Sequence, residues 1–202
     1  MGSRWAGLAA AVGGGLVVVN YLFWTANGVA PDRLPAGPGT PAGAFTLAAI
    51  GGGTLLLTLG LPTLMQRQRR SLSEAGVVGG WMLVGGFLLW ALGALAGPSV
   101  LVLPWWVGET DQLLVAVGSV LFGLASAAAG VLPRWAALLV GVCGLVGLLP
   151  SAGPDLLFFV LGLGVAPGVG VRTLGYAALA LFGVGWVGLG YAVWTARQRR
   201  SA

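Results

Sequence analysis

The sequence contains no lysine, no histidine and a single cysteine, and each shortage removes a class of chemistry. Without lysine there is no Schiff-base catalysis and no retinal attachment of the rhodopsin kind. Without histidine, most membrane metalloenzymes, haem ligation and serine–histidine catalysis lose their usual residue. Cys143 alone forms neither an intramolecular disulfide nor a CxxC redox pair. The sequence therefore predicts no metal, no cofactor and no catalytic residue, and favours a protein that is not an enzyme.

Charge is also scarce: 7% of the 202 residues are charged and 57% are hydrophobic, whereas soluble domains are about a quarter charged. A water-soluble fold of this size could not cover its own apolar surface. A bilayer removes that difficulty, and membrane helices also tolerate the 37 glycines. The sequence predicts one transmembrane domain over 1–202, a multi-pass helical bundle in the cell (plasma) membrane with the lipid bilayer as its main partner.

The net charge of +5 does not indicate a nucleic-acid partner. A phosphate-binding surface needs a continuous basic patch, and here the arginines mostly flank apolar segments. Such flanking is typical of membrane topology.

Uncharged stretches set the predicted spans, because about 20 apolar residues are needed to cross about 30 Å of hydrocarbon. The first stretch could instead be a secretory signal peptide, since Arg4 precedes it and 28–30 resembles a cleavage site. Its length and aromatic end favour a retained helix. The proline- and glycine-rich 27–43 and the tryptophan-containing 98–109 are predicted loops. The six predicted spans are about 5–25, 44–65, 75–96, 110–131, 135–149 and 173–195.

The segment 156–171 is the hardest to assign. Its helix-compatible part, 156–166, reaches only about 17 Å at helical rise, and Pro167-Gly168 then interrupt it. We predict a short re-entrant or interfacial segment, with seven spans as the alternative.

Arginine placement predicts the orientation, because cytoplasmic flanks are enriched in basic residues. With six spans and both termini in the cytoplasm, eight of the ten arginines lie inside. Four of the five acidic residues then lie outside. A seventh crossing would place the arginines of the C-terminal RQRR on the outer side.

Small residues four apart favour close helix packing in membranes. They also allow self-association into a homo-oligomer, or assembly into a larger membrane complex. The pairs are Ala9/Gly13, Gly76/Gly80, Gly93/Gly97, Ser126/Gly130 and Ala137/Gly141. Among the tryptophans, Trp24 is expected to anchor at the interface, and Trp81, Trp90 and Trp186 to pack within spans.

Polar residues gather at the predicted outer end, either as an ordinary wetted loop surface or as a vestibule that attracts a cation or polar solute. Asn20 is expected to hydrogen-bond toward Thr46 on the next span, with Tyr176 at a similar depth. Glu109 and Asp111 diverge by about 200° on a helix and are not expected to share a substrate atom. The candidate vestibule residues are Asn20, Asp32, Glu109, Asp111, Asp155 and Arg172.

Three functions follow from this interpretation. The first is a non-enzymatic structural or accessory membrane component, since the predicted spans carry no charge in their interiors. The second is a small-solute or cation transporter or channel, or its membrane subunit, that uses the acidic vestibule. The third is an enzyme acting on lipids, which would require the carboxylates of Glu109 and Asp155 to converge.

Overall fold

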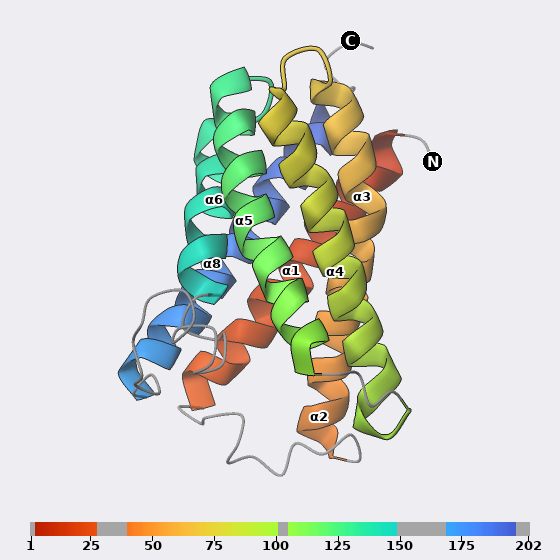
Figure 1. Ribbon diagram of the computed structural model, residues 1–202, viewed down its shortest axis with the longest axis vertical. Coiled ribbons are helices and arrows are strands. Elements are labelled where there is room, and N and C mark those ends of the chain that lie inside the picture. Colours follow the sequence, from red (N-terminus) through yellow and green to blue (C-terminus); the bar gives the residue numbers. More distant parts are fainter. Residues whose placement is uncertain (1–2, 28–39, 101–104, 149–168, 197–202) are drawn as a thin grey trace.

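The computed structural model describes residues 3–27, 40–100, 105–148 and 169–196, and the regular elements in these ranges are all helices (Figure 1). Five helical segments are long and apolar enough to cross a membrane. A further apolar helix, at 134–147, is shorter. The predicted all-helical class is therefore confirmed for the described residues, whereas the count of six spans and their orientation stay predictions.

Each predicted span coincides with a helix, although the boundaries differ. The helices are α1 (Ser3–Asn27), α2 (Pro41–Thr46), the π-helix η1 (Leu47–Gly51), α3 (Gly52–Gln68), α4 (Glu74–Val100), α5 (Trp105–Ala129), α6 (Arg134–Leu148) and α8 (Val169–Thr195). The segments α2, η1 and α3 run on without interruption and form one long helical unit.

Four helix ends fall inside segments that were predicted as loops or as the re-entrant segment. Helix α2 begins at Pro41, inside the predicted loop, because the Thr40 hydroxyl accepts a hydrogen bond from the Gly43 amide and caps the first turn. Helix α4 continues through Pro98 to Val100, and α5 already begins at Trp105. Helix α8 includes 169–171, so the predicted re-entrant segment is helical at its end. The rest of that segment lies outside the described residues.

The helices form a closed antiparallel ring. They pack in the order α1, α3, α4, α5, α6 and α8, and α8 returns to α1. In Figure 1, α4 and α5 lie in front, with α1 and α8 crossing behind them. Five described arginines lie at one end of the ring, at the start of α1 and near the α3–α4 and α5–α6 turns. We call this end the arginine end, and its residues are Arg4, Arg67, Arg69, Arg70 and Arg134.

Glycines allow several helices to touch backbone to backbone. A Cβ on Gly14 of α1 would lie 2.7 Å from the carbonyl oxygen of Gly183 on α8, and the reverse substitution would give the same distance. On α5, a Cβ on Gly123 would lie 2.6 Å from the Cα of Gly141 on α6. These are closer than real Cβ contacts, so any side chain larger than hydrogen would push the helices apart.

The predicted small-residue pairs are only partly used in this way. Gly13, Gly76, Gly80 and Gly141 lie against neighbouring helices. Gly93 has no atom within 4 Å of an added Cβ. Gly130 has a positive φ of 66° directly after α5, where it ends the helix instead of packing against another.

An aromatic cluster fills the middle of the ring. Trp186 of α8 is fully buried, stacks on Phe122 of α5 at 5.9 Å between ring centroids, and meets Phe87 of α4 edge-on at 5.8 Å. Phe182 completes the cluster, which we call the aromatic plug. The predicted packing role of Trp186 is therefore confirmed.

Large apolar side chains also cover the outside of the ring, as a lipid-facing surface requires. The predicted packing role of Trp81 was wrong, because this side chain is 58% exposed. The predicted interfacial role of Trp24 was also wrong, since Trp24 is 6% exposed and faces the interior.

Candidate functional site

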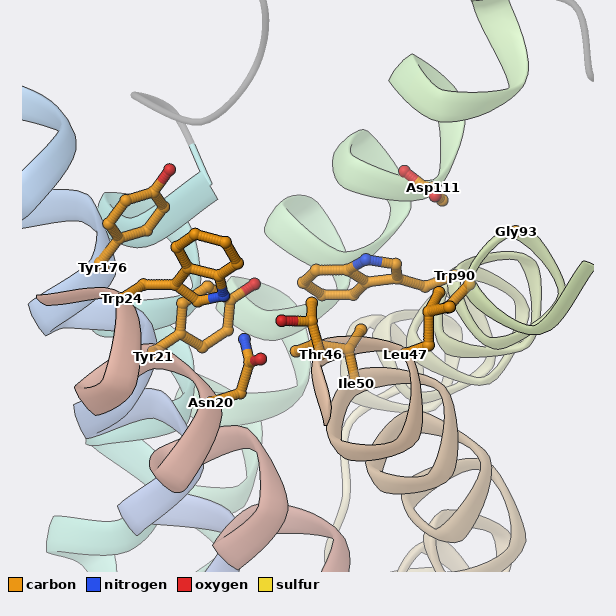
Figure 2. Close-up of a pocket in the computed structure, with 11 residues that line it drawn as sticks. Asn20, Tyr21, Trp24, Thr46, Leu47, Ile50, Trp90, Gly93, Asp111 and Tyr176 are labelled. Carbon is orange, nitrogen blue, oxygen red and sulfur yellow. The ribbon is translucent and has the colours of Figure 1, made fainter. Parts of the chain in front are cut away.

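A cavity of about 410 Å³ lies at the end of the ring opposite the arginine end. This volume falls within the range of about 300–1,000 Å³ typical of small-molecule sites. Helices α1, α4, α5 and α8 and the α2–η1 segment all contribute to the wall. The lining residues are Asn20, Tyr21, Trp24, Thr46, Leu47, Ile50, Trp90, Gly93, Ala94, Asp111 and Tyr176 (Figure 2).

The π-helix η1 shapes one wall of this cavity. Leu47 and Ile50 belong to η1 and line the cavity, and Thr46 immediately precedes it. A π-helical turn disturbs the regular hydrogen-bond ladder and is frequent at functional sites. The buried Thr54 hydroxyl donates to the Ile50 carbonyl at 2.7 Å and thereby supports the irregular turn. The π-helical turn of η1 is therefore part of the cavity wall.

Two buried oxygen atoms in the cavity wall have no hydrogen-bond partner among the described residues: Asn20 Oδ1 and Thr46 Oγ1. Asn20 is 1% exposed, so protein, not bulk water, surrounds it. Figure 2 shows the Thr46 hydroxyl directed across the gap toward Asn20 and Tyr21. The hydrogen bond predicted between Asn20 and Thr46 was therefore wrong, although both residues do line the same space.

Four aromatic side chains form another part of the cavity wall: Tyr21, Trp24, Trp90 and Tyr176. Tyr21 stacks on Tyr176 at 5.9 Å between centroids, which joins α1 to α8 at the cavity. Trp24 and Trp90 line opposite parts of the wall, and Asp111 lies above Trp90 in Figure 2. A carboxylate therefore lies beside an aromatic enclosure.

The structure brings together only part of the predicted vestibule. Asn20 and Asp111 line the cavity. Asp32 and Asp155 lie outside the described residues. Glu109 lies near the start of α5 and Arg172 near the start of α8, at the same end of the ring, but the side chains of both lie outside the described part.

Sequence reasoning missed three aromatic lining residues, Tyr21, Trp24 and Trp90, and also the apolar ones, Leu47, Ile50, Gly93 and Ala94. One signal could have found Trp24, because it follows Asn20 by four residues and therefore shares its helical face. The hydrophobic pattern gave no such signal for Trp90.

The described lining of the cavity combines one carboxylate with aromatic and apolar side chains. Among the described residues, no three of histidine, cysteine, aspartate and glutamate lie close enough to hold a metal ion. The described lining contains one carboxylate, that of Asp111, and no second acid beside it. On α4, Phe87 of the aromatic plug precedes the lining residue Trp90 by three residues, which is about one helical turn.

Comparison of the chain with family models, with curated proteins and with solved structures gives no match.

Proposed function

We propose that this protein is a multi-pass plasma-membrane protein that binds a small polar or cationic solute in the cavity. It would act as a transporter, or as the membrane subunit of one, and not as an enzyme. The arginine end would face the cytoplasm and the cavity the outside, in a six-span arrangement with both termini inside. If the protein is such a subunit, its partners would be further copies of itself in a homo-oligomer or the other proteins of a larger membrane complex.

The observation that carries the proposal is the buried Asn20 oxygen without a partner. A buried polar group left unsatisfied costs about 1–3 kcal/mol, and the Asn20 side chain is almost fully enclosed by protein. A purely structural bundle would gain by an apolar residue at this position. A bound solute that donates a hydrogen bond to Asn20 Oδ1 would satisfy this oxygen, which explains an asparagine at this position.

A second observation favours transport over binding alone. Farther toward the arginine end, three more fully buried side chains hold polar atoms without partners among the described residues: Trp186, Ser126 and Gln68. They belong to α8, α5 and α3, and Trp186 lies within the aromatic plug. Rearrangement of the plug would let a solute pass these groups in turn. The hypothesis of a structural or accessory component does not explain these buried polar atoms without partners.

Flux into proteoliposomes tests the proposal. We expect uptake of at least one small cation or polar solute, and Asp111→Asn should reduce it by about tenfold or more. Glu74→Gln is the matched control, because it removes one carboxylate at the arginine end, and its uptake should equal that of the wild type. Absence of binding and of flux for every solute would overturn the proposal and favour the accessory role. Equal loss in both variants would contradict the assignment to the cavity.

A further inference from the structure

We propose that an anionic phospholipid binds in a groove between α3 and α4 at the arginine end, with its phosphate on Arg69 and the start of its acyl chains along the apolar wall. The groove opens to the outside of the ring and lies at the opposite end from the cavity. The inference therefore goes beyond the proposed function and does not depend on it.

Two neighbouring helices form the walls of this groove, which has a volume of about 340 Å³. In Figure 1, α3 and α4 lie side by side and are joined by a turn at the arginine end. Helix α4 contributes Val77 and Trp81, which are four residues apart and share one face. Helix α3 contributes residues whose spacing also places them on one face: Pro62, Met65, Gln66 and Arg69.

A close contact between the two helices forms the floor of the groove. A Cβ on Gly80 would lie 2.6 Å from the sulfur of Met65, so the Met65 side chain lies directly against α4. Met65 is 7% exposed, whereas Trp81, next to Gly80, is 58% exposed. Met65 therefore closes the groove toward the interior of the ring, and its open side faces outward.

The charge at the mouth of the groove is positive. Arg69 is the one charged residue of the described lining, and its side chain is exposed. The segment 66–74 around it holds three arginines and one acid, Glu74, which does not belong to the lining. Helix α3 ends here and α4 begins here, so their opposite dipole ends offset each other and the arginine decides the sign. The mouth therefore attracts an anion.

The wall below Arg69 favours a lipid over a free phosphate. Pro62 and Arg69 are seven residues apart, which corresponds to about 10 Å along the helix axis. A free phosphate would contact the arginine and leave the apolar wall of Pro62, Met65 and Val77 uncovered. A phospholipid covers both, and basic pockets between transmembrane helices are known to bind anionic lipid head groups.

Two further lining side chains match the glycerol region of such a lipid. The indole N–H of Trp81 can only donate a hydrogen bond, and the amide of Gln66 can also donate. Phosphate and ester oxygens accept these bonds. Tryptophan is enriched at the depth of the lipid head groups, where its amphipathic ring is favoured. The large exposure of Trp81 is therefore explained by a place beside the lipid esters.

Native mass spectrometry of the delipidated full-length protein in a non-ionic detergent tests the inference. Three probes share their acyl chains and differ at the head: phosphatidylglycerol, phosphatidylcholine and diacylglycerol. Glycerol 3-phosphate supplies the phosphate without the chains. We expect phosphatidylglycerol to bind about fivefold or more tightly than phosphatidylcholine, on the scale of one arginine at an anionic lipid surface. Diacylglycerol should bind least among the lipids, and glycerol 3-phosphate should not compete.

Variants assign the binding to the groove. Arg69→Gln should remove the preference for phosphatidylglycerol. Arg134→Gln removes the same charge from an exposed arginine at the same end, on α6, and should keep the preference. Trp81→Ala should weaken lipid binding by about threefold or more, because it removes the ring and its N–H donor. Trp5→Ala is the matched control, since Trp5 is 65% exposed and lies outside the groove.

Several outcomes would overturn the site. Equal binding of phosphatidylglycerol and phosphatidylcholine, or equal loss in Arg69→Gln and Arg134→Gln, would show only a general attraction to the arginine end. Competition by glycerol 3-phosphate would show a phosphate site without a role for the apolar wall. A lipid-free dimer that Trp81→Ala converts to a monomer would show that a second copy covers the groove. None of these outcomes bears on solute uptake, so the proposed function is decided by its own experiment.

Discussion

Asn20 combines a location on the inner face of α1 with an amide oxygen that no described residue satisfies. Such an atom lowers the stability of the empty protein, because its desolvation is not compensated. The same atom gains most when a ligand donates to it. Stability and binding should therefore respond in opposite directions to a change at this residue.

Asn20→Leu should leave the protein equally stable or more stable by up to about 1 kcal/mol, because an apolar side chain of similar size replaces an amide whose oxygen is unsatisfied. Solute binding should fall by about tenfold or more. Thermal unfolding in detergent measures the first effect and equilibrium binding the second. The control is Thr25→Val on the same helix, whose hydroxyl donates to the Tyr21 carbonyl and does not line the cavity; it should bind normally. A large loss of stability in Asn20→Leu would show that the amide has a structural role.

The two described members of the predicted vestibule, Asn20 and Asp111, stand out in the sequence because polar and charged residues in or beside membrane spans are rare. Trp24 and Trp90 do not stand out in this way. When lipid and protein interior are both apolar, hydrophobicity no longer tells which face of a helix points inward. Which face of each helix points inward depends on the glycine contacts between helices. A single sequence does not show which glycine packs against which helix, so it does not show which aromatic rings line the cavity.

At the scale of elements, the π-helix η1 sets the direction in which Thr46 points. Deleting one residue, Ala48, should convert the wide turn to a regular α-helix and rotate α2 by about 100° relative to α3. Thr46 and Leu47 would then leave the wall. We expect normal helix content by circular dichroism but loss of solute binding. Ala48 is exposed, so Ala48→Leu keeps the register and should bind as the wild type does. Retained binding after the deletion would show that η1 has no part in the site.

The seam between α1 and α8 offers a test with two adjacent residues. A Cβ on Gly14 would lie 2.7 Å from the Gly183 carbonyl oxygen, whereas Gly15 has nothing within 4 Å. Gly14→Ala should therefore destabilise the protein by about 1–3 kcal/mol through overpacking. Gly15→Ala should be neutral or stabilising by up to about 1 kcal/mol, because alanine favours the helix. Unfolding in mixed detergent micelles measures both. Equal stability of the two variants would contradict the close approach of these helices.

The helices themselves follow from the sequence more readily than their ends do. Long uncharged runs placed the helices of the described ring, since a bilayer forces such runs to satisfy their backbone internally. The end at Thr40-Pro41 was missed, although a capping threonine followed by proline is a helix start signal. Pro98 was expected to end α4, yet the described helix extends two residues beyond it.

At the scale of the whole molecule, α6 is the element on which the crossing count depends. Its 15 residues reach about 22 Å, less than the roughly 30 Å of hydrocarbon. It nevertheless packs between α5 and α8, which have 25 and 27 residues, and touches α5 backbone to backbone at Gly141. The two neighbours of α6 are long enough to cross a membrane, so whether α6 also belongs to a crossing decides the count.

Cysteine labelling of the Cys143→Ala protein in sealed cells decides between six and seven crossings. Single cysteines at Gly37, Ser71, Ser151 and Ser201 report on successive segments, and Ser71 is exposed in the turn between α3 and α4. With six crossings, an impermeant reagent added outside should label Gly37→Cys and Ser151→Cys. Ser71→Cys and Ser201→Cys should react only after the membrane is opened, which is the internal control for sealing. Outside labelling of Ser201→Cys with protection of Ser71→Cys would establish an odd number of crossings. The C-terminal arginines would then lie opposite the Arg67–Arg70 turn, although both α3 and α8 run toward the arginine end, so that outcome would contradict the closed antiparallel ring itself.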